Sequence, residues 1–156
     1  MQHNQLLDKE LIQYNTDLNS QAEVFEQIAS LAIKQGIATD KEAVVKGLIQ
    51  REEESTTGFY NGFAIPHTKD YSIKKAGIVI LVNDNGIEWD SMDGEPAKFF
   101  ISLLIPDEEG GSTHLKVLSA ISKMLIHDDV RSELSEAKSS DEIYDIINGF
   151  LNEHMN

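Results

Sequence analysis

Cysteine is absent from the 156 residues of this chain. Its absence excludes disulfides, thiolate metal ligands and thiol nucleophiles. Basic side chains are scarce as well, because 13 Lys and Arg stand against 27 Asp and Glu, for a formal net charge of −14. So acidic a protein is repelled by nucleic acid and by anionic membrane surfaces, and we expect neither as its main partner.

Long apolar runs are also missing. The longest, near 78–82 and 99–105, are too short to span a bilayer, and the N-terminal stretch lacks the pattern of a signal peptide. We therefore expect a cytoplasmic protein, and the length indicates a single domain over residues 1–156. The sequence also lacks the phosphate-binding loop, the dinucleotide fingerprint, the nucleophile elbow and the zinc-protease motif.

The patterns that are present predict an α/β fold, with helices first, strands in the middle and helices last. Capping boxes followed by apolar residues at helical spacing mark three helix starts: Ser20 with Glu23, Thr39 with Glu42, and Ser139 with Glu142. The expected helices cover 20–36, 39–54, 114–125, 128–137 and 139–150. Nearly continuous apolar runs favour strands that are buried on both faces. The expected strands cover 10–14, 63–66, 77–82 and 98–106, with turns at 83–86 and 91–96.

His67 has the most unusual position of the five histidines. It ends a short apolar strand after Ile65 and Pro66, and Gly58 and Gly62 lie just upstream. Proline fixes the backbone direction and glycine permits tight turns, so an imidazole is expected at the mouth of a strand, beside a flexible loop. The alternative is a histidine that caps a strand end with one backbone hydrogen bond.

Two further side chains suit the binding of an anion. His114 lies in the first turn of a predicted helix, where unpaired N–H groups attract anions, although it could also simply face solvent. Arg51 ends the second helix, where it could grip phosphoryl oxygens or merely favour the helix C-terminus. Two histidines and an arginine at one site would form a phosphoryl-transfer centre, with one imidazole as the nucleophile.

Residues 51–70 read REEESTTGFYNGFAIPHTKD. They closely resemble the active-site segment of the enzyme IIA domains of the bacterial phosphoenolpyruvate-dependent sugar phosphotransferase system, in the fructose, mannitol and nitrogen-regulatory branch. Residues 57–67 are similar to the family pattern T-G-x-x-x-G-x-A-x-P-H, and 89–106 and 114–125 resemble further family segments. The resemblance implies one IIA domain with a core over about 6–150 and a mixed, mostly parallel β-sheet flanked by helices.

The resemblance also implies the roles of the candidate residues. His67 matches the phospho-accepting histidine, His114 the second active-site histidine, and Arg51 an arginine near the phosphoryl group. The implied donor is the phosphocarrier protein HPr, and the implied acceptor is a cysteine of enzyme IIB. Because this chain has no cysteine, that IIB lies on another chain, through which a membrane-bound IIC would be reached. No metal or other cofactor is expected.

The leading interpretation is a sugar-transport IIA of the fructose type, and the alternative is a nitrogen-type regulator that signals by its phosphorylation state. A metal-binding or hydrolytic histidine site is disfavoured, since no two histidines have ligand spacing. Phe59, Tyr60 and Phe63 are predicted to form an aromatic rim around His67 that binds the partner. The alternative is that one or two of them pack inward, Phe63 first, because it begins the strand. Thr68 stands where the family often has glycine or alanine.

Overall fold

A mixed β-sheet forms the centre of the protein. The computed structural model describes residues 6–107 and 111–154, and side chains within these ranges except those of 111–114. Antiparallel pairing joins β4 to β5, whereas β1 with β4, β2 with β5 and β3 with β5 are parallel, so the expected mixed and mostly parallel sheet is confirmed. The strands are β1 (Leu7–Gln13), β2 (Phe63–Ala64), β3 (His67–Asp70), β4 (Gly77–Ile87) and β5 (Ala97–Pro106).

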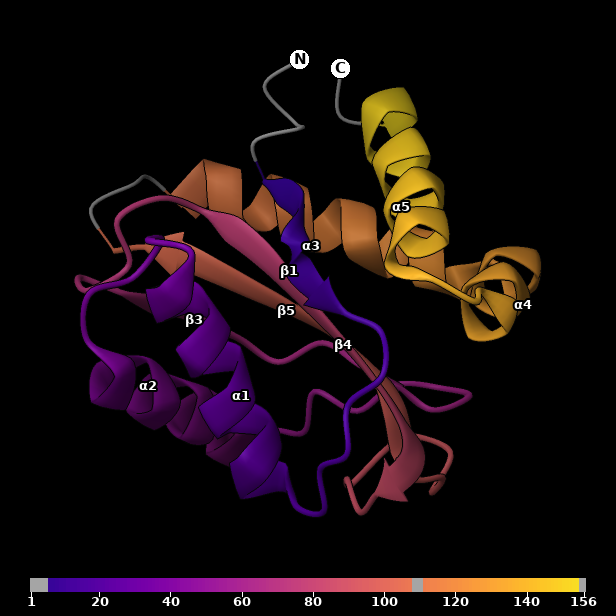
Figure 1. The fold of residues 1–156 in the computed structure, drawn as a ribbon, viewed down its shortest axis with the longest axis horizontal. Coiled ribbons are helices and arrows are strands. Elements are labelled where there is room, and N and C mark those ends of the chain that lie inside the picture. The colour runs from indigo at the N-terminus through magenta and orange to yellow at the C-terminus, as the bar shows by residue number, and fades with distance from the viewer. Residues whose placement is uncertain (1–5, 108–110, 155–156) are drawn as a thin grey trace.

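Helices cover both faces of this sheet. Two of them, α1 and α2, pack on one face, and α3, α4 and α5 contribute to the core on the other (Figure 1). Burial on both sides explains the continuous apolar run in β4, where successive residues from Ile78 to Leu81 are fully buried. Within the described residues, no helix is long and apolar enough to cross a membrane. The helices are α1 (Gln21–Lys34), α2 (Lys41–Glu54), α3 (Gly111–Ile126), α4 (Asp128–Glu136) and α5 (Ser140–His154).

The start of α2 differs from the prediction. Asp40, rather than Thr39, is the N-cap, and its carboxylate accepts a hydrogen bond from the amide of Ala43 at 3.2 Å. Thr39 is bonded elsewhere, because its hydroxyl and its amide both donate to the carbonyl of Ser72, at 3.3 Å and 2.8 Å. The predicted end of the helix, within residues 51–54, is confirmed.

Residues 83–86 were expected to form a turn but belong to β4, which runs on to Ile87. The reason is Asn83, which is fully buried although it is polar. Its amide oxygen accepts hydrogen bonds from the hydroxyl of Thr16 at 2.7 Å and the amide of Leu18 at 2.8 Å. These bonds satisfy the side chain and keep the strand paired to the segment before α1.

Helical spacing indicates an apolar stripe of Leu115, Leu118, Ile121 and Leu125 for α3. It is confirmed at Ile121 and Leu125, which are fully buried, whereas Leu115 is 65% exposed. The expected helix over 128–137 is confirmed as α4, and the turn over 91–96 is present, with Gly94 at a φ of 76°.

Candidate active site

His67 begins β3 directly after Pro66, rather than ending the preceding strand as predicted. Parallel pairing with β5 places His67 opposite Leu103, so the rigid centre of the sheet fixes its backbone. Only 8% of the residue is exposed. The imidazole is therefore held in a shielded position and not on a free surface.

Two hydrogen bonds define the protonation of the His67 ring. Nε2 lies 3.1 Å from the Nε of Arg51, and Nδ1 lies 2.8 Å from the carbonyl oxygen of Ile65. The guanidinium can only donate, so Nε2 accepts; the carbonyl can only accept, so Nδ1 carries the proton. The ring is thus a neutral tautomer with its lone pair at Nε2, which is the form that a nucleophile needs.

Arg51 reaches the imidazole from the last turn of α2. A second hydrogen bond, from Nη1 to the carbonyl of Ser55 at 2.8 Å, orients its guanidinium. The planar fork of an arginine suits the oxygens of a phosphoryl group, which a donor would bring to the same nitrogen, Nε2. The structure thus brings together two of the three predicted catalytic residues.

His114 is the third predicted catalytic residue. The first turn of α3 includes it, but its side chain lies outside the part that the structure describes. Its role therefore stays a prediction from the sequence. Within the described part of the chain, no three His, Asp or Glu side chains form a group that could hold a metal ion.

Glu52 supports the site in a way that the sequence analysis missed. Its carboxylate accepts hydrogen bonds from the amide of Thr57 at 2.7 Å and from its hydroxyl at 2.6 Å. The carbonyl of Thr57 in turn accepts from the amide of Ile65 at 3.0 Å. The sequence offered no signal for this pairing, because Glu52 is the first of three adjacent glutamates and nothing in the sequence distinguishes it from the other two.

The segment from Gly58 to Gly62, called the active-site loop below, needs its glycines. A Cβ on Gly58 would lie 2.7 Å from the Cα of Ser91, so a larger residue does not fit. Asn61 and Gly62 have positive φ angles of 58° and 86°, which asparagine and glycine tolerate best. The Asn-Gly pair could have been identified from the sequence as a turn signal.

The three predicted rim aromatics have different environments. Tyr60 is 44% exposed, and half-buried Phe59 packs against it nearly edge to face, with ring centroids 5.1 Å apart. Phe63 is fully buried as the first residue of β2 and packs on Phe99 at 4.8 Å. The prediction that Phe63 meets a partner is therefore wrong, and the alternative that it packs inward is confirmed, because its side chain belongs to the buried core cluster to which α3 and α5 contribute.

A close approach between α2 and β3 yields a stability prediction. A Cβ on Gly47 would lie 2.3 Å from the Oγ1 of buried Thr68, the neighbour of His67. Alanine normally stabilises a helix interior, but here we expect Gly47→Ala to lower the free energy of unfolding by about 1–3 kcal/mol through overpacking. Urea unfolding measures this change.

Two further variants test that explanation. Adding Thr68→Ala to Gly47→Ala should restore the lost stability, because it removes the clashing hydroxyl. Gly149 lies in α5 with nothing within 4 Å of its added Cβ, so Gly149→Ala should instead stabilise by about 0.5–1 kcal/mol. Equal effects at the two glycines would contradict the proposed clash.

Comparison with known proteins identifies the family to which this fold belongs. Residues 5–149 match the family "Phosphoenolpyruvate-dependent sugar phosphotransferase system, EIIA 2". The fructose-specific EIIA component of Haloferax volcanii is 38% identical over 122 residues, which cover 78% of this chain and 79% of the relative. The chain belongs to the EIIA 2 family of the phosphoenolpyruvate-dependent sugar phosphotransferase system.

Solved structures agree with this assignment. The nitrogen regulatory protein IIA-Ntr of Neisseria meningitidis superposes with a TM-score of 0.86 at 25% identity, covering 94% of this chain and 99% of that one. The mannitol IIA of Escherichia coli, solved in complex with phosphorylated mannitol IIB, has a TM-score of 0.76 at 19% identity and covers 92% and 99%. At that identity the mannitol protein shows the fold alone.

Proposed function

We propose that this protein is a phosphocarrier of a sugar phosphotransferase system. It accepts a phosphoryl group from phospho-HPr on Nε2 of His67 and passes it to a cysteine of a separate enzyme IIB, in support of the uptake of a fructose-type sugar. The observation that carries the proposal is the hydrogen-bonded pair of Arg51 and the neutral His67 ring. A relay fed by phosphoenolpyruvate operates in the cytoplasm, where we expect the protein.

The first transfer uses the lone pair on Nε2. It attacks the phosphorus of the donor's phosphohistidine, the new N–P bond forms, and the donor's N–P bond breaks with its electron pair returning to the donor imidazole. Positive charge then develops on the His67 ring, and the carbonyl of Ile65, which accepts from Nδ1–H, stabilises it. Because the N–P bond is already activated, positioning and charge neutralisation suffice, without metal or nucleotide.

Arg51 has a different task in the two states of His67. Before transfer, the Nε–H of Arg51 donates a hydrogen bond to the lone pair of Nε2, and this bond must break before Nε2 can attack the phosphorus. Its N–H groups then turn to the phosphoryl oxygens, with His114 as the second donor. In the second transfer a thiolate of IIB attacks the phosphorus, an S–P bond forms, and the N–P electron pair returns to Nε2.

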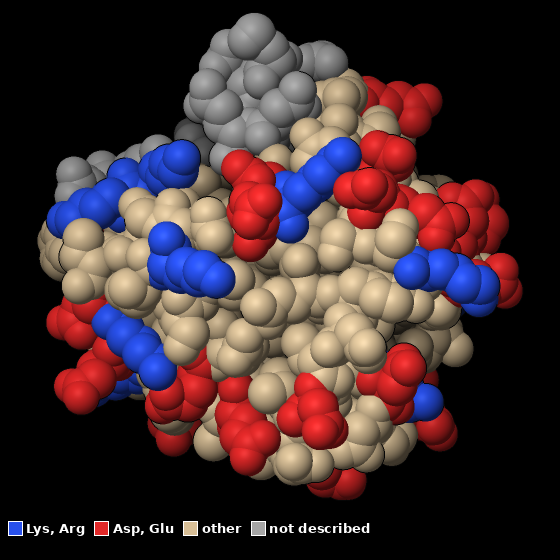
Figure 2. Space-filling view, in the orientation of Figure 1, with Lys and Arg blue, Asp and Glu red and all other residues tan. Residues whose placement is uncertain are grey.

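Surface charge suits a donor with a basic face. Acidic side chains line the right and lower edges of the view in Figure 2, the right edge being the side of α4 and α5. With a net charge of −14, the protein attracts a positively charged partner at long range. The exposed ring of Tyr60 would then provide an apolar contact for this partner.

The fructose-specific relative favours the transport role, and the solved complex of a related IIA fold with phosphorylated IIB supports such an acceptor. The second candidate is a nitrogen-type regulator, which the likeness to the Neisseria meningitidis IIA-Ntr favours. The two roles share the chemistry at His67 and differ in the acceptor.

The test separates the two roles by the fate of the phosphoryl group. The protein is incubated with phosphoenolpyruvate, enzyme I and HPr, freed of the donors, and mixed with purified fructose-type IIB, and intact mass follows both proteins. We expect one acid-labile phosphoryl group that moves to IIB. A group that stays on this protein would support the regulatory role, and no phosphorylation at all would contradict both.

A further inference from the structure

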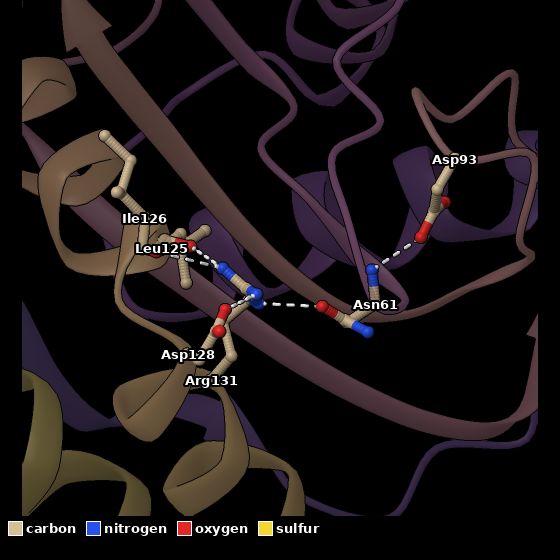
Figure 3. A network of polar contacts seen from close by, with 6 residues as sticks. All are labelled: Asn61, Asp93, Leu125, Ile126, Asp128 and Arg131. Carbon is tan, nitrogen blue, oxygen red and sulfur yellow. Dashed lines mark hydrogen bonds and ion pairs between the residues drawn. The ribbon is translucent and has the colours of Figure 1, made fainter.

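Asn61 links the active-site loop to two distant parts of the chain (Figure 3). Its side-chain oxygen accepts a hydrogen bond from the Nε of Arg131, in α4, at 2.9 Å. Its backbone amide donates to the carboxylate of Asp93 at 2.9 Å. The residue is thus held from one side by a helix and from the other by the turn that precedes β5.

Arg131 is itself firmly held. Nη1 donates to the carbonyls of Leu125 and Ile126 at the end of α3, and Nη2 pairs with Asp128. Only 13% of its side chain is exposed. The planar guanidinium therefore presents its Nε toward Asn61 in a fixed direction, unlike a mobile surface arginine.

Asp93 completes the arrangement. Backbone amides of Asn61 and Glu95 donate to its two oxygens at 2.9 Å and 3.1 Å. These hydrogen bonds, that from Asn61 first, lower the pKa of the Asp93 carboxyl, so it stays ionised at neutral pH. The charged acceptor helps to hold Asn61 at its positive φ of 58°.

We propose that the contact between Asn61 and Arg131 positions Tyr60 for partner docking, so that Arg131 is a positioning residue for the relay. Tyr60 directly precedes Asn61, and its exposed ring rests on Phe59 alone among the described aromatic rings. This inference rests on the proposed function, because the partner that meets Tyr60 is the phosphoryl donor.

The chemistry at His67 has separate supports. The pairing with β5, the carbonyl of Ile65 and the guanidinium of Arg51 hold its ring without help from Arg131. Loss of the contact between Asn61 and Arg131 should therefore weaken docking and leave the transfer step itself intact. The donor concentration at half-saturation reports docking, and the limiting rate at saturating donor reports the transfer step, so measuring both distinguishes the two effects.

Asn61→Gly is the cleanest variant for this test. Glycine keeps the positive φ and removes only the side-chain acceptor, so Arg131 can still cap α3. Phosphorylation is followed by rapid quench at rising phospho-HPr concentrations. Half-saturation should require about tenfold more donor than in the wild type, as expected for the loss of one charge-assisted hydrogen bond. The limiting rate should stay within about twofold of the wild-type rate. Asn61→Asp keeps an acceptor for Arg131 and should retain near-wild-type half-saturation.

Arg131→Gln provides an independent arm from the other side of the contact. It should raise half-saturation as Asn61→Gly does, and the double variant should be no worse than Arg131→Gln alone, since both changes break one contact. Unchanged half-saturation in Asn61→Gly, or an equal loss in limiting rate, would overturn the inference.

Amide hydrogen exchange separates this inference from the proposed function, because it needs no donor. The amides of Phe59 and Phe63 are bonded within the loop turn, to the carbonyls of Phe63 and Tyr60. They should exchange faster in Asn61→Gly but not in Asn61→Asp. Wild-type exchange in Asn61→Gly overturns the positioning role even if the relay works, whereas a wild-type protein that HPr cannot phosphorylate refutes the proposed function.

Discussion

Replacing His67 with alanine is expected to abolish phosphorylation by phospho-HPr while leaving the protein folded. The Nε2 lone pair that accepts from Arg51 is lost with the ring, and with it the proposed nucleophile. Losing the hydrogen bond to the Ile65 carbonyl should lower the free energy of unfolding by only about 1–2 kcal/mol. Intact mass measures phosphoryl uptake, and thermal unfolding checks the fold.

His127 and His154 provide matched controls for that loss. Both are exposed, and both rings lie against Phe150. Alanine variants of either should accept one phosphoryl group as the wild type does. Full phosphorylation of His67→Ala, or loss of phosphorylation in a control variant, would show that the nucleophile lies elsewhere.

Changing Arg51 should produce the second largest effect. Arg51→Gln removes the charge and the fork that neutralise the moving group, and the loss of such a donor typically slows transfer by about 10²–10³-fold. Arg51→Lys keeps the charge but not the planar geometry, so its rate should lie between those of Arg51→Gln and the wild type. Rapid-quench measurements of both transfers, from HPr and to IIB, give these rates.

His114 extends the same test to a residue whose role comes from the sequence alone. We expect His114→Ala still to accept the group from HPr but to pass it to IIB much more slowly. Lys123, in the last turn of α3, provides a control on the same helix, and Lys123→Ala should leave both rates unchanged. Wild-type rates in both transfers for the Arg51 and His114 variants would exclude a three-residue site.

Local signals predicted most elements of the fold. The Ser20 hydroxyl caps α1 through the amide of Glu23, as its capping box indicated, and the Ser139 hydroxyl bonds the amide of Glu142 at the start of α5. The turn predicted at residues 83–86 was wrong, because hydrogen bonds to Thr16 and Leu18 keep Asn83 in β4. Turn propensity is local, whereas that burial depends on a distant segment.

In the candidate site too, the residues could be predicted from the sequence but their contacts could not. His67 and Arg51 were each identifiable, but their hydrogen bond and the ring's protonation depend on how α2 packs against β3. The contact between Asn61 and Arg131 joins residues 70 positions apart, and a single sequence contains no signal for it. Phe63 was the aromatic most expected to pack inward because it begins a strand, and it is fully buried, whereas Tyr60 on the loop is exposed.

The most direct test of the account is to identify the phosphorylated nitrogen. The protein is labelled with ¹⁵N in its histidines and phosphorylated through enzyme I and HPr, and two-dimensional NMR assigns both ring nitrogens of each histidine. The account predicts one phosphorylated histidine, His67, bonded to phosphorus at Nε2 and still protonated at Nδ1. Phosphorus on Nδ1 of His67, or on another histidine, would contradict it.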